Sequence, residues 1–303
     1  MVQGAGSMIV KKGFKGVLVP RLIEAGQEID DTPEDIIQYQ HGLFCQLSLP
    51  RSKTDSLTFE RNYNGAAVKI RAGELWDGKQ YVQQSLPYGA HPRLILAHIH
   101  TEAVQRRTRF IDLEGSAARF MQRIGVRSQG HDFYTFKKQM KAIAAAEFVM
   151  GYTNSQGSPT TLRAHPVKSF SGWTTTDEGQ GVLWPAEMEL SKDYYDDLLL
   201  HAVPLDARAM IALKHSALAI DAYSFLAKRM HTLRRPVRIA FKHFHDQFGQ
   251  EYKTVKDFSR EWRKAIATAK FVYPMAKITP TKGGLILEPS PPPISGATPK
   301  LIK

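Results

Sequence analysis

Two short stretches of the sequence carry the residue types of a metal-dependent nuclease. His98 and His100 lie in HIHTE, and Tyr194 and Tyr195 lie in DYYDD. On a β-strand, histidines two positions apart point to the same face and could hold one metal ion, and a tyrosine could then attack the DNA backbone. The residues around the histidines have a helical pattern instead, and two such positions on a helix point about 200° apart. We therefore expect neither metal ligands nor catalytic residues here.

Another stretch has the chemistry of a surface that binds a polyanion. TVKDFSREWRKAIATAKFVY, residues 254–273, predicts an amphipathic helix. Its expected apolar face consists of Val255, Phe258, Trp262 and Ile266. Its expected basic face consists of Lys256, Arg260, Arg263 and Lys264, with Lys253 just upstream. A helix that reads the major groove of DNA needs both faces, because one anchors the helix and the other meets the DNA.

Further basic residues flank this helix, where contacts to phosphates are expected. In the same third of the chain they are Arg234, Arg235, Lys242, Lys277 and Lys282. A long helix in the first part of the chain has a weaker version of the pattern, formed by Arg127, Lys137, Lys138 and Lys141. For this weaker set the sequence leaves two alternatives open, contact with DNA or a dimer surface.

The positive charge of the protein is concentrated at one end. The 303 residues have a formal net charge of +12. Residues 201–303 contain 18 lysines and arginines against 7 acidic residues, whereas the first 200 residues contain 23 against 22. Such a concentration predicts a polyanionic partner for the C-terminal third. A membrane surface fits less well, because it needs a basic amphipathic segment that is free to lie flat.

Other features of the composition disfavour several classes of protein. Cys45 is the single cysteine, which excludes a disulfide framework and fits a reducing cytoplasm. The sequence has no signal-peptide pattern, no apolar run long enough to span a bilayer and no G-x-x-x-x-G-K-[ST] phosphate loop. The acid pairs Asp30–Asp31 and Asp196–Asp197 have the pattern of helix-start or exposed carboxylates. We therefore expect a cytoplasmic protein that is not an enzyme and needs no cofactor or metal.

The order of the expected elements repeats along the chain. Residues 86–188 and residues 189–289 each predict a helix, a short strand, a short helix, a long helix and a β-hairpin. This is the order of a winged helix, in which a hairpin wing follows a helix-turn-helix. We expect an α+β fold with two tandem winged-helix domains, the second being the main DNA-binding domain. A small, partly β N-terminal region, 1–85, precedes them, and a proline-rich tail, 290–303, follows.

Capping residues locate the individual helices. Helix N-caps are expected at Ser116, Asp206 and Ser216, and two further helices are expected to start at Ser191 and at Thr254. In the N-terminal region, Thr32 as N-cap and Pro33 at the first helical position predict a helix that starts in TPEDIIQYQHGLFCQLSLP. Residues 1 to about 30 are glycine-rich and weakly patterned, and the extreme end is expected to be loose; residues 57–84 predict short strands and hairpins.

Several segments resemble the plasmid-encoded RepA-type replication initiators. They are LPYGAHPRLILAHIHTEAV, AVPLDARAMIALKHSALAIDAYSFLAKRMH, FHDQFG, VKDFSREWRKAI and GGLILEPSPPP, and they span roughly residues 86–293. The resemblance implies a protein that binds repeated double-stranded DNA sites at a plasmid origin, helps to open the origin and recruits host replication proteins, such as helicase-loading or primase machinery. It also implies a homodimer in equilibrium with a monomer, and no catalytic residues.

Two alternatives from other classes stay open. One is a metal-dependent tyrosine nuclease that nicks an origin with His98, His100 and Tyr194 or Tyr195. The other is a DNA-binding transcription regulator without a replication role. A nuclease would leave itself attached to a DNA end, and a regulator would not be needed for a plasmid with that origin to replicate.

Overall fold

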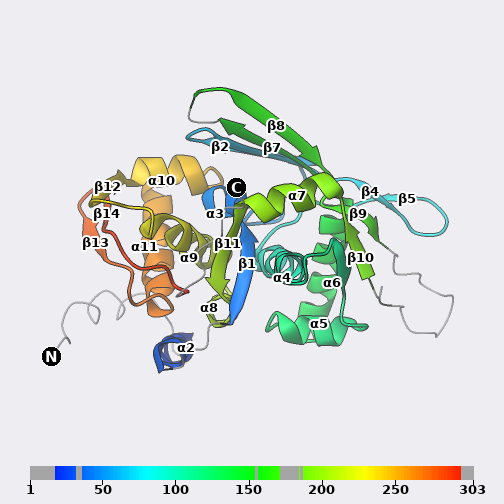
Figure 1. The fold of residues 1–303 in the computed structure, drawn as a ribbon, viewed down its shortest axis with the longest axis horizontal. Helices are drawn as coiled ribbons and strands as arrows, with labels where there is room; N and C mark the ends of the chain where they lie inside the picture. The colour runs from blue at the N-terminus through cyan, green and yellow to red at the C-terminus, as the bar shows by residue number, and fades with distance from the viewer. Residues whose placement is uncertain (1–17, 32–35, 154–155, 171–183, 185–186, 295–303) are drawn as a thin grey trace. The chain divides into compact units, whose positions relative to one another are not determined.

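Residues 18–31, 36–153, 156–170, 184 and 187–294 are described by the computed structural model of the chain (Figure 1). They form two units. The terminal unit holds the residues up to Ile37 together with those from Pro204 onward, and the central unit holds Gln38–Val203. Each unit combines helices with small antiparallel sheets, which confirms the predicted α+β class.

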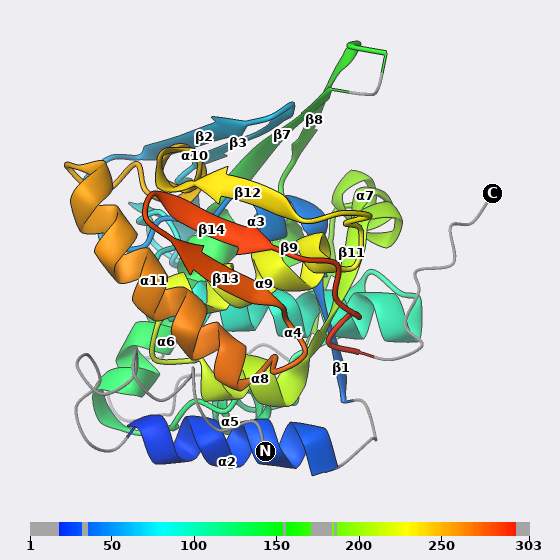
Figure 2. The ribbon, with the colours of Figure 1, turned by 90° about the vertical axis from the view of Figure 1, so that its left-hand side faces the viewer.

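In the described part of the terminal unit, two helices precede a helix, a strand, two helices and two strands, and these three strands form one sheet. Its elements are α2 (Leu18–Asp31), α8 (Ala207–Ala212), α9 (Ala217–Met230), β12 (Val237–Ala240), α10 (Phe241–Phe248), α11 (Val255–Phe271), β13 (Ile278–Thr281) and β14 (Gly284–Leu287). The last strand is central in the antiparallel sheet, whose order is β12-β14-β13 (Figure 2). The hairpin turns at Lys282 and Gly283, next to the predicted turn at Gly283–Gly284.

Residues predicted to cap or to start helices lie at the helix starts of both units. The side chains of Ser116, Asp206, Ser216 and Thr254 accept hydrogen bonds from backbone N–H groups in the first turns of α5, α8, α9 and α11. Ser191 occupies the N-cap position of α7, but its side chain makes no capping bond. These predictions succeed because a cap satisfies N–H groups that the helix itself leaves unpaired.

Aromatic rings hold α11 against its neighbours in the terminal unit. The ring of Trp262, which is fully buried, lies 4.8 Å from Phe248, 5.3 Å from Phe244 and 5.5 Å from Phe258 between ring centroids. Ile266 is also buried. The predicted apolar face of α11 is therefore confirmed except at Val255, which is 38% exposed because it lies at the first position of the helix.

The central unit is built around one four-stranded sheet and a group of helices. Its first elements are β1 (Ile37–His41), α3 (Gly42–Gln46), β2 (Thr58–Tyr63), β3 (Ala66–Arg71), β4 (Glu74–Trp76), β5 (Tyr81–Gln83), α4 (Ala90–Arg106) and β6 (Phe110–Asp112). They are followed by α5 (Ala117–Arg123), α6 (Gly130–Ala145), β7 (Glu147–Thr153), β8 (Pro159–Ala164), β9 (Val167–Phe170), β10 (Glu187–Leu190) and α7 (Lys192–His201). The division between the units falls at the start of β1 and within β11 (Ala202–Asp206).

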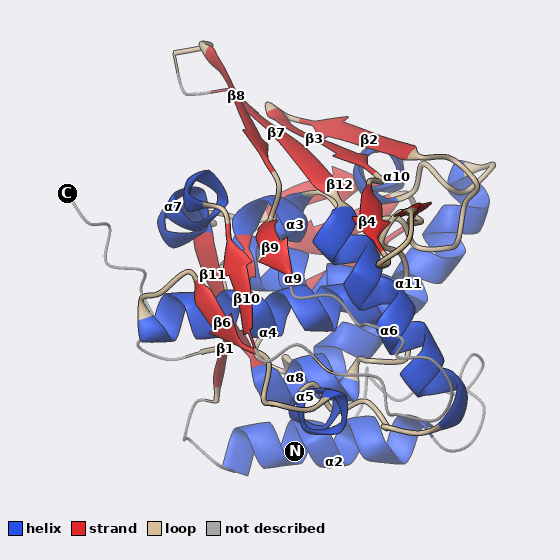
Figure 3. Ribbon diagram, turned by 90° about the vertical axis from the view of Figure 1, so that its right-hand side faces the viewer, coloured by secondary structure: helices blue, strands red, loops and turns tan. Residues whose placement is uncertain are grey.

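Three antiparallel sheets pair strands of the central unit. The largest has the order β2-β3-β7-β8, with Val68 opposite Met150 in its middle (Figure 3). A second has the order β6-β10-β9, and the hairpin β4-β5 forms the third. Strand β6, which follows α4, thus pairs with β10, the last strand of its sheet along the chain. In the same way β12, which follows α9, pairs with β14 in the terminal unit. The strands predicted in residues 57–84 are confirmed as β2 to β5.

The N-terminal region contains one helix that the sequence did not predict and one prediction that is wrong. Residues 18–31 are helix α2, which packs on α8 and on α11 so closely that a Cβ at Gly26 would lie 2.2 Å from the carbonyl oxygen of Phe271. Residues 37–41, expected to be helical, are strand β1. Side chains of α4 stabilise this extended backbone, because Thr101 Oγ1 and His100 Nδ1 accept the N–H groups of Tyr39 and His41. Thr32 and Pro33 lie outside the described residues.

A search of the described helices finds none that is long and apolar enough to cross a membrane.

The turn between α10 and α11 depends on a glycine. A Cβ at Gly249 would lie 2.6 Å from Cδ2 of Phe258 and 2.9 Å from Cα of His245. We expect Gly249→Ala to lower the free energy of unfolding by about 1–3 kcal/mol, since the added methyl forces a packed ring to move. Gly283→Ala is the matched control, because its Cβ would meet nothing nearer than 3.8 Å. Urea unfolding of the two variants would contradict this expectation if their midpoints were equal.

Candidate nucleic-acid interface

The basic face predicted for α11 is exposed. Lys256, Arg260, Arg263 and Lys264 all lie on the solvent side of the helix. Phe258, Trp262 and Ile266 occupy the opposite side and are buried. The buried apolar side therefore fixes the helix in its unit, and the opposite side exposes four cations to solvent. A helix that binds in a DNA groove needs this arrangement.

Acidic residues are interleaved with these cations. Arg260 contacts Asp257 at 3.4 Å and Glu261 at 3.1 Å, and Lys264 contacts Glu261 at 3.1 Å. Partial burial would raise the pKa of Glu261, but the hydrogen bonds from Arg260 and Lys264 outweigh it and lower the pKa. The guanidinium of Arg263 lies instead over the ring of Phe241, 4.1 Å from its centroid. Two of the four cations are therefore oriented by carboxylates and one by an aromatic ring.

The other basic residues expected in the C-terminal third are likewise exposed. Arg234 and Arg235 lie between α9 and β12, and Lys242 lies on α10. The others are Lys253 before α11, Lys277 before β13 and Lys282 in the turn of the β13–β14 hairpin. All of them belong to the terminal unit, so one folded unit carries every cation of this set.

The weaker set lies in the central unit and is less available to a partner. Lys137, Lys138 and Lys141 are half-buried on α6. Burial, and then the charge of Lys141, lower the pKa of Lys137, whose ammonium lies 5.6 Å from the ring centroid of Phe133. Arg127 is exposed and contacts Asp132 at 3.0 Å. These side chains are thus partly engaged within their own unit.

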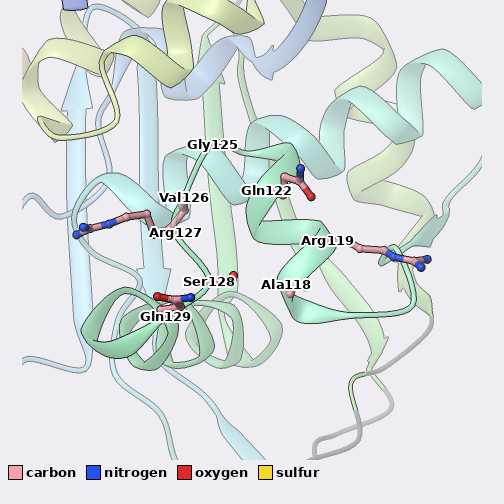
Figure 4. A pocket seen from close by; sticks show the side chains of 8 residues that line it. All are labelled: Ala118, Arg119, Gln122, Gly125, Val126, Arg127, Ser128 and Gln129. Carbon is pink, nitrogen blue, oxygen red and sulfur yellow. The ribbon is translucent and has the colours of Figure 1, made fainter.

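A hollow of about 530 Å³ lies between α5 and the turn that leads into α6 (Figure 4). It is lined by Ala118, Arg119, Gln122, Gly125, Val126, Arg127, Ser128 and Gln129. The side chains of Arg119 and Arg127 point away from each other on opposite sides of it, so each guanidinium could meet an anionic oxygen of its own (Figure 4). Sequence reasoning missed Arg119 and Gln122. The available signal was their position on a capped short helix directly before a turn.

The nuclease alternative is not supported by the geometry of its residues. His98 and His100 lie on helix α4, as their helical pattern predicts. The ring of His98 packs against Phe120 at 4.7 Å, whereas His100 Nε2 lies 2.8 Å from the hydroxyl of Tyr194. Tyr194 is fully buried, and burial raises the pKa of its phenol, so it is poorly suited to act as a nucleophile. Burial also raises the pKa of Tyr195.

A polar cluster centred on Asp197 was not foreseen. Its carboxylate accepts hydrogen bonds from the hydroxyl of Tyr152 at 2.9 Å and from His41 Nε2 at 2.8 Å, and it lies 3.1 Å from His201 Nδ1. Its side chain is 14% exposed and lies in the middle of α7, so the expectation of a helix-start or exposed carboxylate is wrong for Asp197. Burial would raise the pKa of Asp197, but the hydrogen bonds from His201 and His41 lower it well below its usual range. The spacing of Asp197 and His201, four positions apart on one helix, was the available signal.

Comparison with known proteins identifies the family of the sequence and solved structures with a similar fold. The family model described as plasmid encoded RepA protein matches residues 86–247, more than half of the chain. No curated protein matches the sequence. A crystal structure of domains 2 and 3 of RctB, as selenomethionine derivatives, is similar with a TM-score of 0.50 and 11% identity, over 82% of this chain and 98% of that one. A second RctB structure of domains 2–3 has a TM-score of 0.47 and 11% identity, over 81% and 94%. The first likeness supports the mixed helix and sheet architecture alone.

Burial of the two α4 histidines predicts acid sensitivity. The pKa of His98 is lowered to about 4 by burial, against 6.5 for an exposed histidine. The unfolded chain therefore binds more protons than the folded chain between these values, and stability is lost as pH falls from about 6.5 to about 4. We expect His98→Gln to reduce this loss by up to about 3 kcal/mol. Urea unfolding at a series of pH values measures this loss of stability, and His131→Gln, at an exposed histidine, is the control. The expectation would be contradicted if the free energy of unfolding fell equally steeply with pH in the two variants.

Proposed function

Because the chain belongs to the family of plasmid-encoded RepA proteins, we propose that it is a replication initiator that binds double-stranded DNA repeats at a plasmid origin in a sequence-specific way. The observation that carries the proposal is the exposed basic face of α11, held by an apolar face in the unit with the excess positive charge. The family match ends at residue 247, before α11 begins at Val255. The role of this helix is therefore argued from its geometry.

The element order of the terminal unit supports a winged-helix assignment. In this assignment α9, α10 and α11 are the three helices, α11 is the recognition helix and β13–β14 is the wing. In the central unit α4, α5 and α6 with β6, β9 and β10 have the same order, with β7 and β8 inserted before the wing. We propose residues 189–289 as the main DNA-binding domain, residues 86–188 as the first winged-helix domain, 1–85 as an N-terminal region and 290–303 as a tail.

Two kinds of contact are proposed for the terminal unit. On α11, Arg260 and Arg263 have the fork geometry that pairs with guanine, and Lys256 and Lys264 supply point charges for phosphates. The flanking cations Arg234, Arg235, Lys242, Lys253, Lys277 and Lys282 are assigned to phosphates. If six such contacts form, the logarithm of the affinity falls with the logarithm of the salt concentration with a slope of about −5.

A weaker contact is proposed for the central unit. Arg119 and Arg127 line the hollow beside the turn before α6 and point away from each other (Figure 4), so each could contact a separate phosphate of the DNA backbone. Lys137, Lys138 and Lys141 would support it from α6. The half-buried state of these lysines also suits a surface between two copies of the chain, which agrees with an equilibrium between monomer and homodimer.

The proposed activity is binding without a catalytic step. Opening of the origin would be driven by the free energy of binding to DNA at a sequence that is easily deformed. The opened origin would then be passed to host replication proteins, such as helicase-loading or primase machinery. The location proposed for these events is the cytoplasm.

Removal of the two α11 arginines tests the interface. We expect Arg260→Ala with Arg263→Ala to weaken binding to origin repeats at physiological salt at least tenfold, since each arginine that pairs with guanine contributes about 1–3 kcal/mol of discrimination. A mobility-shift titration measures it. The control is Arg229→Ala with Lys270→Ala, which removes two charges from the same unit outside the proposed contacts. Wild-type affinity in the first variant would refute the assignment of α11.

The carboxylate of Glu261 provides a test in the opposite direction. It lies among the proposed contacts and holds Arg260 and Lys264 by hydrogen bonds. We expect Glu261→Gln to tighten DNA binding about fivefold, because it removes a negative charge worth about 1 kcal/mol near phosphates. Glu288→Gln, outside the proposed contacts in the same unit, should leave the affinity unchanged. A weaker complex with Glu261→Gln would argue that phosphates do not approach this face.

A further inference from the structure

Three potential metal ligands meet inside the central unit. His41 comes from the end of β1, and Asp197 and His201 come from α7. One ligand atom of each lies within 4.8 Å of the other two. His41 Nε2 is 2.8 Å from one carboxylate oxygen of Asp197, and His201 Nδ1 is 3.1 Å from the other. Ligands around a tetrahedral zinc ion lie about 3.4 Å from one another, so small side-chain shifts would create the geometry.

We propose that His41, Asp197 and His201 form a binding site for a divalent transition-metal ion of the Zn²⁺ class. Two imidazoles and one carboxylate leave one tetrahedral position for water, as in open zinc sites. The ion would enter beside His201, whose side chain is 42% exposed, whereas that of His41 is fully buried. Mg²⁺ and Ca²⁺ prefer oxygen ligands and are poor occupants of this set.

Neighbouring rings and hydroxyls support the three ligands. The hydroxyl of Tyr152 donates to Asp197 at 2.9 Å, and its ring stacks on His201 with a centroid distance of 5.1 Å and an angle of 11°. The ring of Tyr194 stacks on His41 at 5.8 Å. Such partners fix the orientation of metal ligands and tune their affinity.

The hydrogen bonds of His41 and His201 define what must change when an ion binds. The N–H of Leu43 donates to His41 Nδ1 at 3.1 Å, so the proton of neutral His41 resides on Nε2 and is donated to Asp197. A metal bond at Nε2 moves this proton to Nδ1 and ends the capping bond to Leu43, at the first turn of α3. His201 Nδ1 likewise lies 3.0 Å from the backbone oxygen of Asp197 and gives its proton to Nε2. Both histidines change tautomer, and neither releases a proton.

Calorimetric titration of the full chain with ZnCl₂ tests the site. We expect one ion per chain, and an affinity that falls at least about tenfold in Asp197→Asn and in His201→Gln, as expected for a lost ligand or its orienting partner. Asp196→Asn is the matched control, since Asp196 is the neighbouring carboxylate on α7 and contacts Lys192 instead. The half-exposed His201 provides a variant that folds even if Asp197→Asn does not. MgCl₂ should give no comparable binding.

Nitrogen NMR of the histidine rings gives a second readout. We expect His41 Nδ1 to be unprotonated in the free protein and protonated after one equivalent of Zn²⁺. Equal Zn²⁺ affinity in wild type and His201→Gln, no stoichiometric binding, or an unchanged His41 tautomer would overturn the proposal. A mobility-shift assay of the same variants keeps this result separate from DNA binding, for which the proposed function assigns the main contacts to α11 in the terminal unit.

Discussion

The packing of Trp262 against the aromatic side chains of α10 and α11 is the contact on which the terminal unit depends. Its ring is fully buried among Phe244, Phe248 and Phe258. Burial of an aromatic or aliphatic side chain contributes about 1.5–3 kcal/mol, whereas an exposed ion pair contributes about 0–1 kcal/mol. The orientation of α11 is therefore set by its apolar side. The charged side follows from it, because residues three and four positions apart share a face.

Exposed charge alone would bind any polyanion, so the acidic residues of α11 have a physical consequence. Asp257 and Glu261 restrain Arg260 and reduce the positive potential of the face. A weaker field lowers the sequence-independent attraction to phosphates, which supplies most non-specific binding to DNA. A restrained guanidinium also loses less conformational freedom when it pairs with a base. Both effects favour discrimination among sites over affinity for DNA in general, which fits a protein proposed to select origin repeats.

Local signals in the sequence predicted the helices and strands of the terminal unit from α8 to β14. The elements and clusters that depend on contacts between distant residues could not be predicted in this way. The cap at Thr254 and the period of Phe258, Trp262 and Ile266 lie within one helix, so their effect can be read from neighbouring residues. Strand β1 is different, because its N–H groups are bonded by Thr101 and His100 about 60 residues away in sequence. The exposure of the basic face followed from helical period alone. The cluster around Asp197 did not, since His41 lies 156 positions from Asp197.

The two units have related element orders but use their polar residues differently. On α11 the cations are exposed, whereas on α6 the lysines are half-buried and burial lowers the pKa of Lys137. The central unit also directs polar side chains inward, where Asp197, His41 and His100 satisfy one another and the backbone. An inward network resists the approach of a polyanion but can hold a compact cation. The DNA contacts that we propose for α11 are thus outward-facing, whereas the metal site that we propose in the central unit is inward-facing and lies on β1 and α7, outside the repeated order of elements.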